Sequence, residues 1–362
     1  MNESPVLFEE RATLSGHRIG VATLNRPGQL NALTLEMCQL LRDRFRAWAS
    51  DEGIVAVLLE GAGDKGFCAG GDVAAVVRQV RSGSPHRFVY GDAFFEVEYS
   101  LDRLIHEYPK PFIAYSHGIC MGGGVGLIAG ASHRVVSDAS RIAMPEIHIG
   151  LFPDVGGGYF LNRLPGGAGV LMALTGLTIN EADAVFAGLA DFFVPRQARE
   201  RLYERVFSLD WSMDAAQDRG MLTRALWDEH GRHQNMLGNS ALMQNFQAIR
   251  SIALQGSVVD LKSALLAAAR QNPYFDAPAK SLENGSPTAA QVSWEYLRRC
   301  RRLSLGQVLA LDLVLARQFQ RHHDFPEGVR ALLIDKDRKP AWSPTQFDEV
   351  DGAVVQGHFS PL

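Results

Sequence analysis

The sequence has few cysteines and no long apolar run, and these two shortages exclude several classes of protein. Only four cysteines occur in 362 residues, and no two of them form a Cys-x-x-Cys pair. This spacing argues against a structural zinc site and favours a reducing compartment. No apolar stretch approaches the roughly 18 residues that a membrane-spanning helix needs.

Charge of either sign is not in large excess. The chain carries 36 Lys and Arg against 40 Asp and Glu, so nothing in the balance indicates nucleic acid as the main partner. The first ten residues are acidic and show neither a secretory apolar segment nor an Arg-rich transit pattern. We therefore expect a cytoplasmic protein that acts on a small molecule, with no membrane or nucleic-acid partner and with homo-oligomerisation left open.

Apolar periodicity predicts a layered α/β core followed by a mainly helical region. Buried strands are predicted at 19–24, 54–59, 111–115, 133–137 and 141–144. Helices are predicted at 34–49, 94–105, 122–130, 156–163, 166–175 and 180–187. Strand signals fade beyond Val194, and a turn-rich break interrupts the later helices at 281–288. The predicted division is a catalytic core at 1–195 and a helical region at 196–362.

Two carboxylates, Glu146 and Asp154, lie eight residues apart in a segment of apolar residues and glycines. Acids in such surroundings are costly to bury unless they are protonated, paired or used in chemistry. Glu146 could act as a nucleophile or a general base, or it could cap a helix or pair with an arginine. Asp154 could equally be the N-cap of a helix that begins near Gly156.

Two glycine-rich turns, at 67–72 and 121–126, precede these acids. Such turns free backbone N–H groups to point at a ligand oxygen. Gly71 and Gly123 are the candidate donors of an oxyanion hole, where each donor stabilises the charge on a thioester or ester carbonyl by roughly 3–4 kcal/mol. The alternative is that these glycines only permit close packing.

Glu98 interrupts the apolar face of the helix predicted at 94–105. Acids at core positions are rare, so we expect Glu98 to face a pocket. The alternative is that it reaches solvent or Arg103 at the edge of that face.

Two further patterns suggest other ligands. Residues 124–129 match Gly-x-Gly-x-x-Ala, but a dinucleotide site should open directly after a strand, and 116–121 separate it from the strand at 111–115. No His or Cys cluster has metal-ligand spacing, so neither a nicotinamide nor a metal cofactor is expected. The arginine cluster at 298–302 could bind phosphate or RNA, although such a run is more often a solvated helix face.

Three of these segments resemble the crotonase superfamily of enoyl-CoA hydratases and isomerases: 66–72, 117–124 and 144–158. Within it, residues 149–161 and the C-terminal stretch 324–342 are similar to the 3-hydroxyisobutyryl-CoA hydrolase branch. The resemblance implies an α/β fold, a crotonase-like spiral of ββα units with a helical C-terminal extension. It also implies an acyl-CoA substrate, with coenzyme A brought by the substrate rather than held as a cofactor.

The resemblance further implies site roles. The thioester carbonyl would be held by the Gly71 and Gly123 amides, Glu146 would be the catalytic carboxylate, and Glu98 and Asp154 would line the acyl pocket. Hydratases carry a second catalytic Glu where this chain has Gly126, and usually a glycine where it has Asp154.

Both departures favour hydrolysis of a 3-hydroxyacyl-CoA, most simply 3-hydroxyisobutyryl-CoA in valine breakdown. An enoyl-CoA hydratase or isomerase that takes its second acid from Asp154 or Glu98 is the first alternative. A non-catalytic acyl-CoA or RNA-binding protein on the same fold is the second.

Overall fold

A computed structural model describes residues 4–362, so the first three residues of the acidic N-terminal segment lie outside it. The chain forms two compact units, each assembled from three stretches. The first unit contains Met1–Gly71, Ser100–Ile142 and Ile179–Ala241, and the second contains Asp72–Tyr99, Ala143–Thr178 and Leu242–Leu362. The predicted boundary at residue 195 does not coincide with a boundary between these units. The division into a core at 1–195 and a helical region at 196–362 remains a prediction.

A six-stranded sheet forms the centre of the first unit, with strand order β1-β2-β3-β5-β7-β9. Its strands are β1 (Val6–Ala12), β2 (Arg18–Leu24), β3 (Ile54–Gly61), β5 (Phe112–Ser116), β7 (His133–Val136) and β9 (Phe192–Phe193). Only β1 runs antiparallel to its neighbour. Strands β2, β3, β5 and β7 were predicted from their apolar runs. The edge strand β1, which is mostly exposed, and the two-residue edge strand β9 were not predicted.

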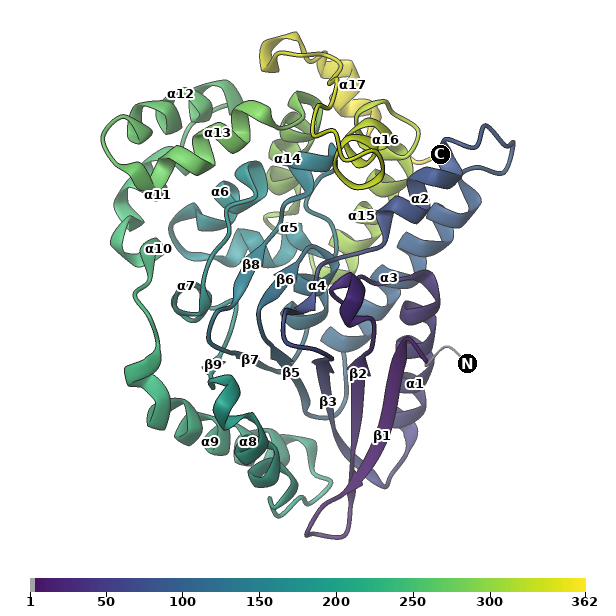
Figure 1. Cartoon of the computed structure of the whole chain (residues 1–362), viewed down its shortest axis with the longest axis vertical. Coiled ribbons are helices and arrows are strands. Elements are labelled where there is room, and N and C mark those ends of the chain that lie inside the picture. Colours follow the sequence, from purple (N-terminus) through teal and green to yellow (C-terminus); the bar gives the residue numbers. More distant parts are fainter. Residues whose placement is uncertain (1–3) are drawn as a thin grey trace. The chain divides into compact units, whose positions relative to one another are not determined.

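Helices cover both faces of this sheet, as the period-two alternation of β2 requires. Ile19 and Val21 join one core cluster with apolar side chains of α8 (Arg199–Phe207) and α9 (Ala215–His233). Gly20 points the other way, where an added Cβ would lie 2.6 Å from the Trp48 ring of α1 (Leu35–Ser50). The sheet therefore lies between α1 and the α8–α9 pair (Figure 1).

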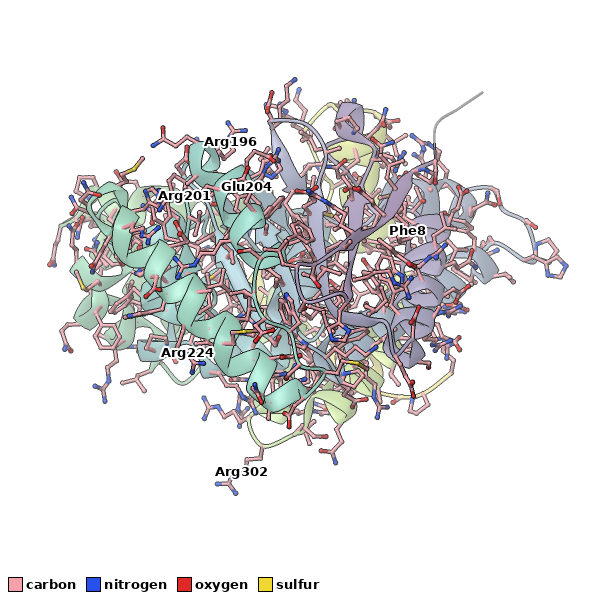
Figure 2. All side chains as sticks on the ribbon, turned by 90° about the horizontal axis from the view of Figure 1, so that it is seen from below. Phe8, Arg196, Arg201, Glu204, Arg224 and Arg302 are labelled. Atoms are coloured by element: carbon pink, nitrogen blue, oxygen red, sulfur yellow. The ribbon has the colours of Figure 1, made fainter. Side chains whose placement is uncertain are left out.

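Helix α8 shows the expected division into a buried and a solvent face. Leu202 and Tyr203 are buried against the sheet, while Arg201 and Glu204 are exposed on the outer surface (Figure 2). Opposite charges alternate there, which agrees with the absence of a basic excess in the sequence.

A second, three-stranded sheet positions the glycine turns. Its order is β4 (Gly66–Cys68), β6 (Ile119–Met121), β8 (Arg141–Ala143), and β4 runs parallel to β6. Helix α4 (Gly123–Ala129) starts two residues after β6 ends. The premise that no strand directly precedes the Gly-x-Gly-x-x-Ala pattern was therefore wrong, because three-residue strands leave little periodic signal. The remaining helix of this unit is α7 (Glu181–Ala187).

The second unit is mainly helical. Its helices are α2 (Val73–Val80), α5 (Gly157–Phe160), α6 (Ala168–Thr175), α11 (Phe246–Ala253), α12 (Val258–Ala269), α13 (Asp276–Asn284), α14 (Pro287–Cys300), α15 (Leu305–Phe319), α16 (Asp324–Val329) and α17 (Gly352–Gly357). The chain crosses between units within α3 (Val89–His106) and α10 (Ala241–Gln244). The predicted break at 281–288 contains the end of α13 and the start of α14, where the Ser286 hydroxyl caps the Ala289 N–H.

No helix within residues 4–362 combines the length and apolar character needed to cross a bilayer.

Candidate active site

The two glycine turns lie side by side in the first unit. Gly70, with φ of +102°, ends the turn after β4, and an ideal Cβ on it would lie 3.7 Å from the Gly123 nitrogen. An added Cβ on Gly124 would lie 2.5 Å from the Cys68 carbonyl oxygen, so only glycine allows this approach. The structure therefore brings the turns of Gly71 and Gly123 together, and it confirms that close packing is one reason for their composition.

Each turn leads directly into a helix. Asp72 follows Gly71 and caps α2 by accepting the Ala75 N–H at 3.3 Å. Gly123 is the first residue of α4, so its N–H is one of the donors that a helix leaves without an internal acceptor. Both expected donor positions thus carry backbone N–H groups at a strand-to-helix junction.

Glu146 begins a short 3₁₀-helix, η2 (Glu146–Ile149), directly after Pro145. Its side chain is buried, and within residues 4–362 its Oε2 atom has no hydrogen-bond partner. Burial raises the pKa of Glu146 well above its usual value, and the charge of nearby Asp154 raises it further. No arginine is paired with this carboxylate in the described chain, so the structure presents a buried acid with a free oxygen rather than an ion pair.

Asp154 is buried and accepts a 2.7 Å hydrogen bond at Oδ2 from the Tyr99 hydroxyl. Burial raises the pKa of Asp154 to about 6, and the bond from Tyr99 opposes that rise. The N-cap of α5 is Gly156, without any side-chain cap, and the Gly157 N–H bonds to the main-chain oxygen of Asp154 at 2.7 Å. The Asp154 side chain therefore does not cap this helix.

Glu98 lies on α3 and is only 2% exposed, so the alternative that it reaches solvent is wrong, while a pocket-facing role stays a prediction. Arg103 pairs with Glu107 one turn further along the helix. The charges of Asp154 and Glu98 both raise the pKa of Tyr99, after the larger effect of its burial. Glu98, Tyr99 and Asp154 thus form one buried cluster in the second unit.

Tyr99 was not predicted as a site residue. Its position beside Glu98 gave the only signal, because a buried tyrosine hydroxyl generally has a polar partner. A partner 55 residues away in sequence cannot be identified from helical periodicity.

The C-terminal stretch packs directly on the segment that carries Glu146. An added Cβ on Gly150 would lie 2.4 Å from the Asp324 carbonyl oxygen, and one on Gly328 would lie 2.4 Å from the carbonyl carbon of Ile149. The Ser286 N–H also bonds to the Ile147 carbonyl at 3.2 Å. Helix α16 therefore supports the end of η2 through backbone contact.

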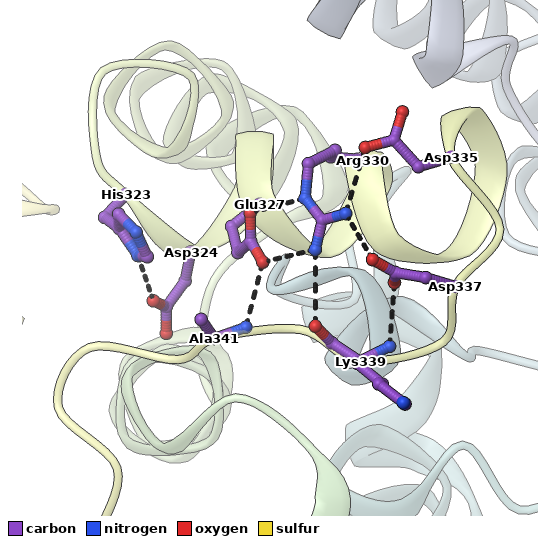
Figure 3. A network of polar contacts seen from close by, with 8 residues as sticks. All are labelled: His323, Asp324, Glu327, Arg330, Asp335, Asp337, Lys339 and Ala341. Atoms are coloured by element: carbon purple, nitrogen blue, oxygen red, sulfur yellow. Dashed lines mark hydrogen bonds and ion pairs between the residues drawn. The ribbon is translucent and has the colours of Figure 1, made fainter.

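Arg330 fixes the chain that follows α16 (Figure 3). Its guanidinium pairs with Glu327 at 2.7 Å, Asp335 at 3.0 Å and Asp337 at 2.6 Å. Its hydrogen bonds lower the pKa of Glu327, whose Oε1 also accepts the Ala341 N–H at 2.9 Å. This network accounts structurally for four charged residues of the C-terminal motif, namely Glu327, Arg330, Asp335 and Asp337.

The arginine cluster at 298–302 lies at the end of α14. Arg298 and Arg299 both pair with Glu295 on the same helix, while Leu297 is buried. This arrangement favours a solvated helix face over a phosphate site.

A pocket of about 570 Å³ opens in the first unit beside the strands that lead into the glycine turns. Its lining residues are Pro27, Gly28, Leu30, Lys65, Gly118, Ile119, Ala139 and Arg141. Lys65 directly precedes β4, and Arg141 begins β8. Neither side chain forms an ion pair with another described residue, so both cations are available to a ligand.

Comparison with known proteins identifies the family. Residues 19–359 match the family model described as enoyl-CoA hydratase/isomerase, and the chain belongs to this family, the crotonase family. Proteins named 3-hydroxyisobutyryl-CoA hydrolase are 36% identical in Danio rerio (99% of this chain, 90% of the relative) and 35% identical in Homo sapiens (95% and 86%). The Arabidopsis thaliana protein named 3-hydroxyisobutyryl-CoA hydrolase 1 is 33% identical (99% and 92%).

Solved structures confirm the predicted crotonase-type α/β fold. A protein described as a carnitinyl-CoA dehydratase from Mycobacterium thermoresistibile superposes with a TM-score of 0.86 at 34% identity, covering 99% of this chain and 97% of the other. One described as an enoyl-CoA hydratase from Rhodobacter sphaeroides gives 0.85 at 34%, covering 99% and 98%.

The predicted cytoplasmic location is wrong according to these relatives, because the vertebrate proteins are named as mitochondrial. The acidic composition of the first ten residues was therefore a poor guide to location.

Proposed function

We propose that this protein hydrolyses a 3-hydroxyacyl-CoA thioester, namely 3-hydroxyisobutyryl-CoA, to 3-hydroxyisobutyrate and free CoA in valine degradation. The observation that carries the proposal is the buried pair of acids, Glu146 with a free oxygen and Asp154 held by Tyr99. The hydrolase relatives at 33–36% identity support the same substrate.

In the proposed reaction, ionised Glu146 attacks the thioester carbonyl or removes a proton from an attacking water. Both routes need the carboxylate form of Glu146. The rate of both is therefore expected to increase as the pH rises through the raised pKa of Glu146. The amides of Gly71 and Gly123 stabilise the oxyanion, the C–S bond breaks, and CoA leaves as a thiolate that takes up a proton. Where Glu146 is the nucleophile, water then hydrolyses the acyl anhydride on Glu146, which releases 3-hydroxyisobutyrate and regenerates the carboxylate. Asp154 binds the 3-hydroxyl and assists proton transfer, and Glu98 lines the acyl pocket.

The pocket beside the glycine turns suits the phosphate-bearing end of the substrate. Lys65 and Arg141 supply two unpaired cations on its wall, and cations near a phosphate form charge-assisted hydrogen bonds. We assign the CoA phosphates to this pocket.

Hydration or isomerisation of an enoyl-CoA is the second candidate, because the two solved structures at 34% identity are described as a dehydratase and a hydratase. Hydration needs two positioned proton carriers on one water. The resemblance places the second one at Gly126, which carries no acid, so hydration would need Asp154 or Glu98 to replace it.

A side-by-side assay separates the candidates. Purified protein is given 3-hydroxyisobutyryl-CoA, isobutyryl-CoA and crotonyl-CoA, with CoA release followed by a thiol reagent and hydration by loss of enoyl absorbance. We expect rapid CoA release from the first substrate and release roughly ten to a hundred times slower from the second, because Asp154 is then left without the hydroxyl. Rapid loss of enoyl absorbance with negligible thiol release would instead establish the hydratase, and binding without either reaction would establish a non-catalytic protein.

A further inference from the structure

The turn that carries Asp154 has an unusual backbone. Val155 has φ of +52° and Gly156 has φ of +82°. A left-handed conformation is a clear outlier for a β-branched residue such as valine. It persists only where surrounding contacts determine it, and such positions cluster at functional sites. The contacts that hold this turn therefore bear on the position of Asp154.

Two side chains from the helical C-terminal region supply those contacts. Oδ2 of Asp312, on α15, accepts the Gly156 N–H at 2.8 Å. The Tyr296 hydroxyl, on α14, accepts the Gly158 N–H at 2.8 Å and donates to Oδ1 of Asp312 at 2.5 Å. Both side chains are fully buried. Two acceptors thus satisfy two backbone donors directly after Asp154 and are linked to each other.

Steric contact complements these hydrogen bonds. A Cβ on Gly158 would lie 2.6 Å from both the Tyr296 ring and the Cys300 sulfur, and a Cβ on Gly156 would lie 2.9 Å from Leu305. Helices α14 and α15 consequently lie directly on the turn, with no space for it to shift toward them.

The same residues are electrostatically connected to the acid cluster. Burial raises the pKa of Asp312 well above its usual value, and the charge of Asp154 raises it further. The charge of Asp312 also contributes to the raised pKa of Tyr99, the partner of Asp154. Asp312 therefore lies within electrostatic range of the pair formed by Tyr99 and Asp154.

We propose that Asp312 and Tyr296 are positioning residues that hold the strained Val155–Gly156 turn in place. We call these two residues the clamp. By fixing the turn, the clamp holds Asp154 where it binds the 3-hydroxyl of the substrate. The clamp gives the helical C-terminal region a part in substrate discrimination. The discrimination step rests on the proposed function, whereas the clamp itself can be tested without substrate.

The test uses Asp312→Asn and Tyr296→Phe in the full chain. An asparagine at position 312 keeps the volume but has one accepting oxygen instead of two. Either the Gly156 N–H or the Tyr296 hydroxyl therefore loses its acceptor. Phenylalanine removes the acceptor of the Gly158 N–H. Leu315→Ala is the matched control, because Leu315 is fully buried on α15 and has no hydrogen bond to the turn.

Hydrogen exchange of the peptide that spans 152–160 is measured first. We expect the Gly156 and Gly158 amides in this peptide to exchange at least about tenfold faster in the clamp variants, and not selectively in the control, because the clamp side chains accept these two N–H groups. Unchanged exchange in both clamp variants would overturn the clamp, whatever the enzyme acts on.

Selectivity is measured second, as the ratio of kcat/KM for 3-hydroxyisobutyryl-CoA to that for isobutyryl-CoA. We expect this ratio to fall about tenfold in the clamp variants and to stay constant in Leu315→Ala, since displacement of one recognition group affects only the substrate that it binds. Equal losses on both substrates would overturn the role in discrimination. Failure of the wild type to release CoA from either substrate would overturn the proposed function, while hydrogen exchange still decides the clamp.

Discussion

The Tyr99 hydroxyl donates a 2.7 Å hydrogen bond to Oδ2 of Asp154. This bond lowers the pKa of Asp154 against the opposing effect of burial, and Asp154 in turn raises the pKa of Glu146. A change at Tyr99 is therefore expected to alter the protonation of both acids, although it touches only one of them.

Tyr99→Phe should raise the pKa of Asp154 further above 6, because the hydrogen bond that favours its ionised form is removed. Carbon-detected NMR titration of labelled aspartate carboxyl groups, with the resonance assigned by its loss in Asp154→Asn, measures this directly. Tyr108→Phe is the control, since that buried hydroxyl bonds to the Phe45 carbonyl instead. An unchanged Asp154 titration in Tyr99→Phe would show that the bond has no influence on the acid.

Glu146→Gln keeps the shape of the side chain but removes its charge and most of its basicity. We expect kcat for CoA release to fall by at least about 100-fold, the lower range for loss of a general base, with a modest change in KM. Steady-state kinetics check this. A variant that retains more than about a tenth of the wild-type kcat would remove Glu146 from the mechanism, because the loss would be smaller than general-base catalysis provides.

Asp154→Asn separates catalysis from stability. The folded pKa of about 6 lies above the ordinary 3.8, so the contribution of Asp154 to stability is present below the ordinary value and lost as the pH rises through about 6. At pH 7 the asparagine variant should therefore melt at the same or a higher temperature than wild type. As the pH is lowered toward 4, the melting temperature of wild type should rise relative to that of the variant.

Activity of the same variant on 3-hydroxyisobutyryl-CoA should fall sharply at pH 7. Thermal melts at pH 4 and pH 7 and an activity assay per folded molecule check both parts. A collapse of the melting temperature with normal activity would make Asp154 a structural residue only.

The sequence located much of the scaffold because the relevant signals are local. Apolar patterns in the sequence predict the strands β2, β3 and β5, which are buried on both faces, and the helix α1. The same kind of pattern places Glu98 on the buried face of its helix. Glycine content indicated the two turns, since few other residues adopt their backbone conformations.

The remainder depends on contacts between distant parts of the chain. The bond from the Tyr99 hydroxyl to Asp154 joins residues 55 positions apart, and the bond from the Gly156 N–H to Asp312 joins residues 156 positions apart. The compact units are interleaved along the sequence, so a boundary based on the fading of strand signals cannot locate them.

Activity should be independent of added metal ions and of nicotinamide, because a carboxylate and two amide donors can supply the polarisation and the nucleophile or base that thioester cleavage needs. Residues 4–362 contain no group of three or more His, Cys, Asp or Glu side chains arranged to hold a metal ion. CoA release is measured before and after EDTA treatment and dialysis. Loss of activity that a divalent ion restores would contradict this expectation.

Lys65→Met and Arg141→Met should each weaken binding of the CoA thioester without weakening binding of the matching pantetheine thioester, which lacks the 3′-phosphate and the pyrophosphate. Methionine keeps much of the apolar stem of each side chain and removes only the charge. We expect KM for the CoA thioester to rise about tenfold in each variant, the effect of one hydrogen bond to a charged group after screening by solvent.

The wild-type KM should also rise with ionic strength more steeply than that of either variant, because added salt screens the interaction that the variants lack. Arg201→Met is the control, since Arg201 is exposed on α8 of the same unit (Figure 2) and does not line the pocket. An equal rise in KM for both thioesters would place Lys65 and Arg141 away from the phosphates, and no rise for either would assign the CoA phosphates to a different surface.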